Sequence, residues 1–446
     1  MKNIFISLIL LLFSYNIYSQ RGFRFYGKED VKQHVKFKLI NNLIVIPLEI
    51  NGKELSFVLD TGVNKTILFN LTKNDSLGLN SISKIELRGL GSGEPVEAYL
   101  SKNNRFKIKS LISSNQDLYI ILKDGFNMSS KMGITIHGII GYDLLKSVIA
   151  KINYNQKVIT FYSPEKYTYK KCKKCEEFPL EFYRNKPYIN TKIQIDTTND
   201  KLTDVKLLID SGGSDAVWLF EDTHKDIKTP KKYFLDILGE GLSGTIYGNR
   251  SKIPKIYLGD FEIKKPTVSF LDSASTFNAR KFRGRNGSIG GNVLKRFKVW
   301  IDYPNEKITF KKSSSLKKGF YYNMSGLTVV YNGQQLIKEE NASRVIDSYG
   351  SKSEASNNKT VSFITSYSYK FKSSYKVETV LKDSPADKAG IKPEDIIRKI
   401  NGKYAHNLTL NEINDMFINK PNKRINIEVE RLGMTLKFEF KLKERI

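Results

Sequence analysis

The sequence predicts a mainly β protein made of two similar lobes and a further, smaller β domain. A set of segments within residues 36–312 occurs twice, in the same order and about 150 residues apart, which indicates a duplicated lobe. Apolar runs of strand length, rich in Ile, Val, Tyr and Phe, alternate with turns that contain Gly or Asn. From about Phe320 onward the chain no longer follows this repeat, and 446 residues exceed what one hydrophobic core accommodates.

The first residues are typical of a secretory signal peptide. Lys2 precedes an apolar run over residues 4–13, and Ser19 offers a small residue before a cleavage point. An uncleaved membrane anchor is the alternative, but the run is shorter than the ~20 residues that a spanning helix needs. We therefore exclude residues 1–19 from the fold and expect an exported protein, periplasmic or extracellular, that is soluble after cleavage.

The formal net charge of +27 raises nucleic acid as a partner. The lysines are spread along the whole chain, and neither an arginine-rich arm nor a nucleic-acid motif is present. We therefore expect no nucleic-acid partner, and instead an attraction to anionic polymers at the cell surface.

The repeat defines the domain organisation. Asp60 and Asp210 stand 150 residues apart, and Gly141 and Gly290 stand 149 apart. The matched pairs are Leu55–Gly62 with Val205–Gly212, Gly89–Gly93 with Gly239–Gly244, Gly138–Leu145 with Gly287–Leu294, and Asn153–Phe161 with Asp302–Phe310. We predict a first lobe over 36–162, an inter-lobe linker over 163–186, a second lobe over 187–312 and a C-terminal domain over 320–446.

Each lobe is expected to hold the same elements. A strand over 44–50 meets the hairpin signal Asn51-Gly52 and returns over 54–59, and the return strand has apolar residues on both faces. One short helix per lobe is expected after a Gly-rich turn, over 143–148 and 292–297.

The predicted linker holds both cysteines, Cys172 and Cys175. Two thiolates cannot complete a four-ligand zinc site, and the four histidines have no metal-binding spacing. A redox pair would need a thioredoxin-like βαβ context, which the sequence lacks. In an exported chain we expect a short disulfide, and we expect neither a metal nor a cofactor.

The C-terminal part has its own pattern. Strands are expected over 326–330 and 377–381, with a polar stretch over 338–360 between them. An amphipathic helix over 410–418 and two closing strands, 424–431 and 434–442, complete the domain.

The triplets Asp60-Thr61-Gly62 and Asp210-Ser211-Gly212 carry the chemistry. Each follows an apolar strand at an equivalent place in the repeat. Two adjacent carboxylates share one proton, so that one can activate a water as a base while the other donates to a carbonyl oxygen. The glycines let each turn present an N–H to its carboxylate, and the hydroxyls of Thr61 and Ser211 can bond across the lobes. A single triplet is usually only a turn.

Residues 36–312 resemble the pepsin and retropepsin clan of aspartic proteases. The two triplets match the catalytic triplets of that clan, and Ile139-Ile140-Gly141 and Ser288-Ile289-Gly290 match the segment that packs behind each catalytic loop. Ser288 departs from the apolar residue usual there. Two such lobes in one chain resemble bacterial predicted aspartyl proteases, many of which also carry a PDZ domain. The resemblance implies a bilobal β fold, Asp60 and Asp210 as the catalytic pair, and polypeptide substrates.

The same resemblance implies that Gly-rich hairpins form flaps over the cleft. The candidates are residues 88–99, with Gly89, Gly91 and Gly93, and residues 238–248, with Gly239, Gly241 and Gly244. Ordinary exposed hairpins are the alternative. Tyr99 and Tyr247 are both candidates for a flap residue, and the sequence does not choose between them.

Residues 320–446 resemble PDZ domains, which are small β-sandwiches or barrels with one or two helices. The resemblance rests on the stretch from Asp383 to Gly390 and on Asn401-Gly402, and Glu394 replaces a usual Gly. It implies that the backbone of Gly326, Leu327 and Thr328 binds the terminal carboxylate of a peptide that adds as a strand. The alternative is a PDZ domain that only packs on the protease, with the polar stretch after Leu336 covering the groove.

Two other functions are less consistent with the sequence. A binding protein could keep the protease and PDZ folds without activity, but both triplets retain their Asp and Gly. A serine hydrolase would need a Gly-x-Ser-x-Gly elbow with a suitable His, and none is visible. An aspartic endopeptidase with a peptide-docking module remains the main hypothesis.

Overall fold

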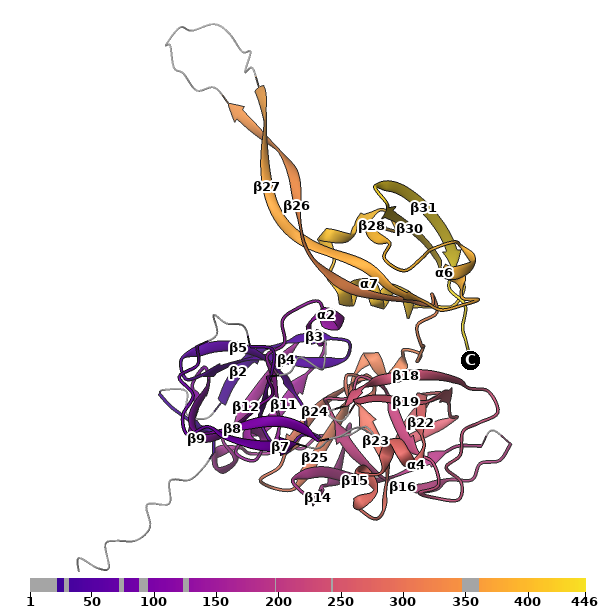
Figure 1. The fold of residues 1–446 in the computed structure, drawn as a ribbon. Helices are drawn as coiled ribbons and strands as arrows, with labels where there is room; N and C mark the ends of the chain where they lie inside the picture. Colours follow the sequence, from indigo (N-terminus) through magenta and orange to yellow (C-terminus); the bar gives the residue numbers. More distant parts are fainter. Residues whose placement is uncertain are drawn as a thin grey trace, which may run out of the picture. The chain divides into compact units, whose positions relative to one another are not determined.

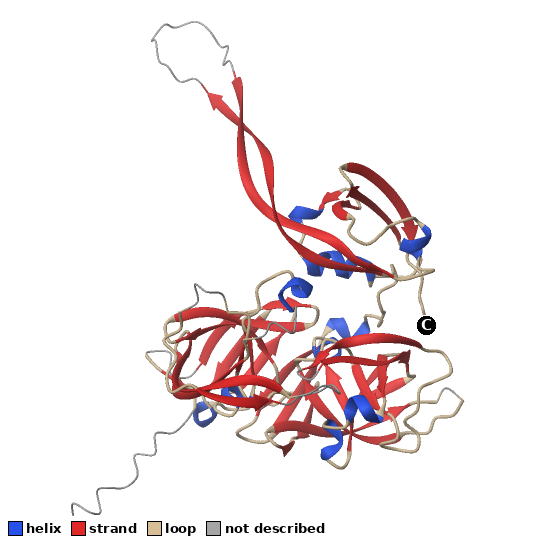
Figure 2. Cartoon of the chain, viewed as in Figure 1, coloured by secondary structure: helices blue, strands red, loops and turns tan. Residues whose placement is uncertain are grey.

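The computed structural model describes residues 22–27, 32–71, 76–87, 95–122, 128–196, 198–241, 244–346 and 361–446 (Figure 1). Strands dominate these ranges, and their helices are short (Figure 2). The predicted fold class, mainly β with two similar lobes and a further β domain, is confirmed. The signal segment predicted over 1–19 lies outside the described residues. Within the described ranges no helix has both the length and the apolar character needed to cross a bilayer.

The chain divides into two compact units. The first contains residues up to Phe126 and residues 136–320, and it holds both lobes. The second contains residues 127–135 and 321–445.

The first lobe is built on a nine-stranded sheet with the order β1-β9-β6-β10-β5-β4-β8-β7, in which β3 pairs with β4. Its strands are β1 Arg24–Phe25, β3 Lys38–Ile40, β4 Leu43–Ile50, β5 Lys53–Leu59, β6 Ile67–Leu68, β7 Ser83–Leu87, β8 Val96–Ile108, β9 Leu111–Ile120 and β10 Gly138–Ile140. Strand β10 runs parallel to β5, with Ile140 beside Leu59. Strand β5, which directly precedes Asp60, therefore lies between β10 and β4.

The second lobe repeats this arrangement in a ten-stranded sheet with the order β18-β19-β22-β17-β23-β16-β15-β20-β21, in which β14 pairs with β15. Its strands are β14 Glu181–Tyr183, β15 Lys186–Gln194, β16 Thr203–Asp210, β17 Val217–Phe220, β18 Phe234–Gly241, β19 Gly244–Lys252, β20 Lys255–Leu258, β21 Phe261–Lys264, β22 Thr267–Leu271 and β23 Arg285–Gly290. Strand β23 runs parallel to β16, with Gly290 beside Asp210. The same pair of parallel strands therefore stands behind each triplet.

A six-stranded sheet joins the lobes in the order β13-β25-β24-β11-β12-β2. Its strands are β2 Lys32–Lys36, β11 Ile149–Asn153, β12 Val158–Tyr162, β13 Cys175–Pro179, β24 Phe297–Asp302 and β25 Lys307–Lys312. Strands β11 and β24, one from each lobe, pair at its centre. The inter-lobe linker over 163–186 stays a prediction, and this segment contributes β13, which pairs with β25. Cys172 and Cys175 form a disulfide with their Cα atoms 5.5 Å apart.

The local signals of the first lobe produce the predicted hairpin. Asn51 and Gly52 have φ values of 49° and 96° and connect β4 to β5, as the left-handed turn of a two-residue hairpin requires. Phe57, Val58 and Leu59 are all buried, so β5 has both faces in the core as predicted.

Short helices follow each Gly-rich turn, namely α3 Tyr142–Leu145 and α5 Gly291–Leu294. Both are shorter than predicted because β11 begins at Ile149 and β24 at Phe297, which leaves no length for a further turn. The other short helices of this unit are α4 Ser273–Thr276 and the 3₁₀ helices Pro164–Lys166, Ala279–Lys281 and Ser314–Lys317.

The second unit has a six-stranded sheet in the order β26-β27-β28-β30-β31, in which β29 pairs with β28. Its strands are β26 Leu327–Ile346, β27 Val361–Val380, β28 Ile396–Ile400, β29 Lys403–Tyr404, β30 Arg424–Arg431 and β31 Met434–Lys441, and its helices are α2 Met128–Met132, α6 Pro385–Lys388, the 3₁₀ helix Ala405–Asn407 and α7 Leu410–Phe417. A Thr409/Glu412 capping box starts the predicted amphipathic helix α7. The polar stretch predicted over 338–360 is corrected in part, because β26 continues through it to Ile346. There the long β26–β27 hairpin extends beyond the sheet (Figure 1).

Candidate active site

Asp60 is held directly after the buried strand β5. Its N–H donates to the carbonyl of Ile140 at 2.9 Å, and the N–H of Gly62 donates to Asp60 Oδ1 at 2.6 Å. A side chain at Gly141 would overlap the Asp60 carbonyl oxygen. The segment Ile139-Ile140-Gly141 therefore packs behind this loop, as the sequence predicts.

Asp210 occupies the equivalent place in the second lobe. It ends β16, and the N–H of Gly212 donates to Asp210 Oδ1 at 3.1 Å. The N–H of Gly290 donates to Ala216 at 2.9 Å, so the end of β23 closes the loop from behind. Both predicted carboxylates thus sit at matching turns and accept an N–H from their own glycine.

The two carboxylates meet. The charge of Asp210 acts directly on the Asp60 carboxyl group. A Cβ at Gly62 would lie 3.2 Å from Asp210 Oδ1, and a Cβ at Gly212 would overlap the Asp60 carboxylate. Glycine at both positions leaves the space that the paired carboxylates occupy.

The hydroxyls of the triplets lock the two loops together. Thr61 N–H donates to Ser211 Oγ at 3.0 Å, and Ser211 N–H donates to Thr61 Oγ1 at 2.9 Å. Thr61 Oγ1 in turn donates to the carbonyl of Ile209 at 2.6 Å, and Ser211 Oγ donates to that of Leu59 at 2.8 Å. Both side chains are buried, so these four bonds fix the position of each carboxylate relative to the other.

The groups that act on the pKa differ between the two acids. Burial, and then the charge of Asp210, raise the pKa of Asp60 to about 7. Burial also raises the pKa of Asp210, but Arg285, Lys186 and the amide of Gly212 act in the opposite direction. Lys186 acts on both carboxylates, whereas Arg285 is among the groups that act on Asp210 and favours its ionised form.

A pH dependence of stability follows from this raised pKa. The folded pKa of Asp60 lies above its ordinary value of 3.8, so its contribution to stability is fully present below about pH 4 and is lost as the pH rises through about 7. We expect the free energy of unfolding of the wild type to fall over this range more steeply than that of Asp60→Asn. Urea unfolding of both proteins across the range measures this, and equal slopes would contradict the raised pKa.

Comparisons with known families agree with this geometry. A family model described as aspartyl protease matches residues 46–144, which include the first triplet and Ile139-Ile140-Gly141. A family model described as PDZ domain matches residues 376–431. The chain carries an aspartyl protease domain followed by a PDZ domain. The second triplet lies outside both matched ranges, so its assignment to the protease site rests on the repeat and on its contacts with the first triplet.

Two individual proteins show more limited likeness. The carboxy-terminal processing protease CtpA of Bacillus subtilis (strain 168) is 41% identical over 54 residues, which are 12% of this chain and 12% of that protein. Among solved structures, an aspartic proteinase from Irpex lacteus matches with a TM-score of 0.43 and 13% identity, over 64% of this chain and 98% of that one.

Tyr303 also supports the protease site, although the sequence did not single it out. Its buried hydroxyl donates to the Thr61 carbonyl at 3.2 Å. Burial, and then the nearby Asp60 and Asp210, raise the pKa of Tyr303 well above its usual range, so it remains a neutral donor. The repeat of Asn153-Tyr154 as Asp302-Tyr303 was a usable signal for it.

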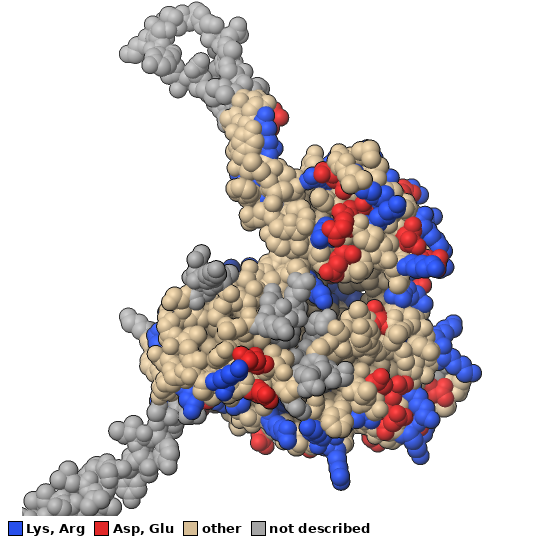
Figure 3. Space-filling view, viewed as in Figure 1, with Lys and Arg blue, Asp and Glu red and all other residues tan. Residues whose placement is uncertain are grey.

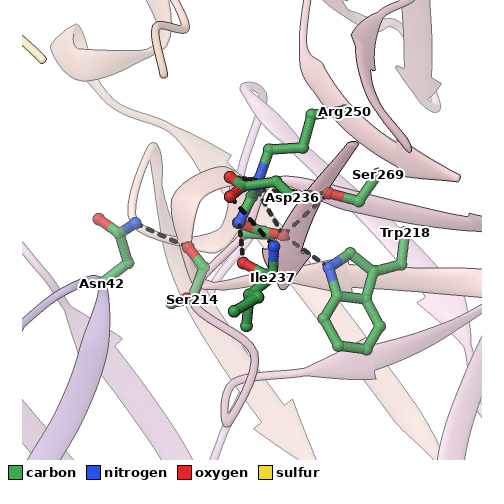
Figure 4. A network of polar contacts seen from close by, with 8 residues as sticks. Asn42, Ser214, Trp218, Asp236, Ile237, Arg250 and Ser269 are labelled. Atoms are coloured by element: carbon green, nitrogen blue, oxygen red, sulfur yellow. Dashed lines mark hydrogen bonds and ion pairs between the residues drawn. The ribbon is translucent and has the colours of Figure 1, made fainter. Parts of the chain in front are cut away.

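A polar network holds the loop that follows the second triplet (Figure 4). Asp215 accepts from Arg250 Nη1 at 2.9 Å and from Trp218 Nε1 at 2.7 Å. Ser269 Oγ donates to the same carboxylate at 3.0 Å. Arg250 Nε also donates to Asp236 at 2.6 Å, so the network ties the β18–β19 hairpin to the catalytic loop.

A second contact in Figure 4 joins the lobes. Asn42, in the turn before β4, donates to the Ser214 carbonyl at 2.7 Å. It also accepts from Lys295 Nζ at 2.6 Å. These bonds fix the second catalytic loop against the first lobe.

The flap candidates have different outcomes. Gly89, Gly91 and Gly93 lie outside the described residues. The glycines of the second lobe lie in the β18–β19 hairpin, where Gly241 pairs with Gly244 and Gly239 adjoins an irregular step. Tyr247 on this hairpin is 52% exposed. A flap role for this hairpin stays a prediction.

The predicted carboxylate-binding loop of the PDZ domain already uses some of its amides. Gly326, with a φ of 85°, donates to Asn323 Oδ1 at 3.3 Å, and Leu327 donates to Ser325 Oγ at 3.0 Å. Thr328 bonds through its hydroxyl to Thr379 at 2.8 Å. A peptide carboxylate would have to compete with these side chains for the two amides.

A cavity of about 760 Å³ lies over the six-stranded sheet that joins the lobes, away from the two triplets. Its lining includes Lys36, Lys109, Lys151 and Lys298. Burial, and then the neighbouring Lys298, lower the pKa of Lys151. Its lining thus combines several lysines and includes no residue of either triplet.

Proposed function

We propose that this chain is an exported aspartic endopeptidase that hydrolyses peptide bonds with a water activated by Asp60 and Asp210. The observation that carries the proposal is the pair of carboxylates that meet at equivalent turns of two lobes. Two carboxylates that share one proton supply an acid and a base at one place, which hydrolysis without a metal or covalent nucleophile requires.

Each carboxylate then has a defined task. Ionised Asp210 takes a proton from the water as the water oxygen attacks the carbonyl carbon, and Asp60 gives its proton to the carbonyl oxygen. The resulting neutral diol collapses with cleavage of the C–N bond. Asp210 passes its proton to the departing nitrogen, and Asp60 recovers a proton from the diol hydroxyl.

The PDZ domain is proposed to recruit peptides by strand addition. Strand β26 stands at the end of the described sheet order, and an edge strand can pair with an extended peptide. Because side chains already occupy the amides of Gly326 and Leu327, main-chain pairing is favoured over carboxylate capture. Regulation of access to the protease site is the competing role.

Export and attraction to anionic cell-surface polymers are proposals that rest on the N-terminal sequence and on charge. The lysine-lined cavity on the six-stranded sheet supports the second. On the face drawn in Figure 3, basic and acidic side chains are interspersed, which favours weak attraction over a dedicated nucleic-acid surface.

Digestion of a denatured protein mixture tests the proposed activity. The wild type should generate new peptide termini, and Asp60→Asn should generate none under the same conditions. A wild type that binds the mixture without cutting it across the acidic to neutral range would favour the inactive binding protein.

Deleting the residues after Phe320 tests the recruitment role. A docking site linked to a catalytic site raises the effective concentration of substrate. We expect the deletion to raise KM for long substrates by about tenfold or more, with kcat on short peptides nearly unchanged. A change of kcat on short peptides would instead support regulation.

A further inference from the structure

Lys186 stands beside the catalytic pair. It opens β15, where Tyr188 pairs with Leu208 of β16 in an antiparallel register. The paired segment ends there, and the same register extended by two residues places Lys186 at the level of Asp210. Its side chain is half-buried and interacts electrostatically with both Asp60 and Asp210.

A second cation near the pair is built into the core. Arg285 is 5% exposed, and its guanidinium lies 4.9 Å from the ring centre of Phe220 and 5.8 Å from that of Tyr188. Its Nε donates to the Gly287 carbonyl at 3.2 Å. Arg285 is thus fixed by its surroundings, and its charge acts on Asp210.

The first lobe shows that the fold does not need these cations. Val45 pairs with Val58, so the same register places Leu43 opposite Asp60, where the second lobe has Lys186. The offset of 149 between Gly141 and Gly290 places Ile136 where the second lobe has Arg285. Leu43 and Ile136 are both buried, so aliphatic side chains fill these positions of the fold.

The charge count at the site is therefore unbalanced. Two carboxylates that share one proton carry one negative charge, and two cationic side chains, Lys186 and Arg285, act on Asp210. Burial, and then Arg285, lower the pKa of Lys186 although Asp60 and Asp210 raise it, so the pair does not fully compensate the cations. Exposed Arg184, near Lys186, adds a further cation. A substrate carboxylate would compensate the surplus through a charge-assisted hydrogen bond.

We propose that Lys186 is a specificity-determining residue that selects peptides with Asp or Glu next to the scissile bond. The inference rests on the proposed endopeptidase function and names its substrate class. Lys186 is the candidate because it keeps part of its side chain accessible to solvent, whereas Arg285 is nearly covered and already bonded.

The test compares pools of short blocked peptides in which one central position is fixed as Glu, Gln or Lys and the rest are randomised. For the wild type we expect the Glu pool to be hydrolysed about tenfold faster than the Gln pool, as one charge-assisted hydrogen bond would give. Lys186→Met should bring this ratio close to one, Lys186→Arg should retain it, and Lys186→Glu should favour the Lys pool. Lys192→Met is the matched control, since Lys192 is exposed on the same strand.

An unchanged Glu/Gln ratio in a folded Lys186→Met protein would overturn the inference. Retention of the same pools on immobilised Asp60→Asn, with and without Lys186→Met, gives a readout that does not need catalysis. If the wild type hydrolyses no pool, the proposed function fails, and the retention ratio still decides the role of Lys186. Equal retention of the Glu and Gln pools by Asp60→Asn would overturn that role.

Discussion

Replacing either Asp60 or Asp210 by Asn is expected to lower kcat/KM on any cleaved peptide by at least about 10³-fold, because each carboxylate works as both acid and base within one turnover. An amide is nearly isosteric with a carboxyl group but cannot exchange the proton. Steady-state kinetics on one cleaved peptide measure the loss for each variant separately. Turnover beyond a trace in either purified variant would remove that residue from the catalytic pair.

The matched control is Asp204→Asn, since Asp204 is an exposed acid on the same strand as Asp210. It should leave kcat/KM unchanged. The two catalytic variants should also remain folded, because an Asn side chain is nearly isosteric and its oxygen can still accept from the amide of Gly62 or Gly212. Thermal unfolding of all three variants separates loss of chemistry from loss of structure.

Ser211→Ala is expected to destabilise the protease lobes strongly. The Ser211 hydroxyl donates to Leu59 and accepts from Thr61 in a buried position. Its removal leaves a buried carbonyl and a buried N–H without these partners, at about 1–3 kcal/mol each. We therefore expect the free energy of unfolding to fall by about 2–5 kcal/mol in urea titrations.

Ser211→Thr is the matched control for this loss, because the first triplet has Thr61 at the equivalent place with the reciprocal bonds. It should retain most of the stability. A cost of Ser211→Ala below about 0.5 kcal/mol, the size of an ordinary surface substitution, would show that the hydroxyl lock does not hold the lobes together.

Much of the candidate site could be predicted because the duplicated lobe contains each catalytic segment once, so the sequence shows the same pattern twice. Asp60 and Asp210, with Thr61 and Ser211, stand at equal positions after apolar strands. The chemistry of a shared proton then requires the two turns to meet, and the structure brings them together. The hairpin at Asn51-Gly52 and the capped helix α7 followed from local signals in the same way.

Other parts could not be predicted from local patterns. Strand β13 forms through pairing with β25, far along the sequence, and nothing in residues 163–186 specifies that partner. The polar part of β26 has the wrong composition for a core strand, and its strand conformation comes from pairing with β27. Lys186 could be recognised only from the strand register of the structure. Extended to the end of β16, this register places Lys186 at the level of Asp210, and the register of the first lobe places Leu43 at the level of Asp60.

The most direct measurement of the central claim uses a non-hydrolysable peptide whose scissile bond is replaced by a hydroxyl-bearing tetrahedral isostere, together with the same peptide lacking the hydroxyl. An enzyme binds a transition-state mimic at least about 10²-fold more tightly than a ground-state ligand. If Asp60 and Asp210 act on a tetrahedral diol, calorimetry should show about this preference for the hydroxyl peptide in the wild type, and its loss in Asp60→Asn and Asp210→Asn. Equal binding of the two peptides to the wild type would contradict the assignment of the pair.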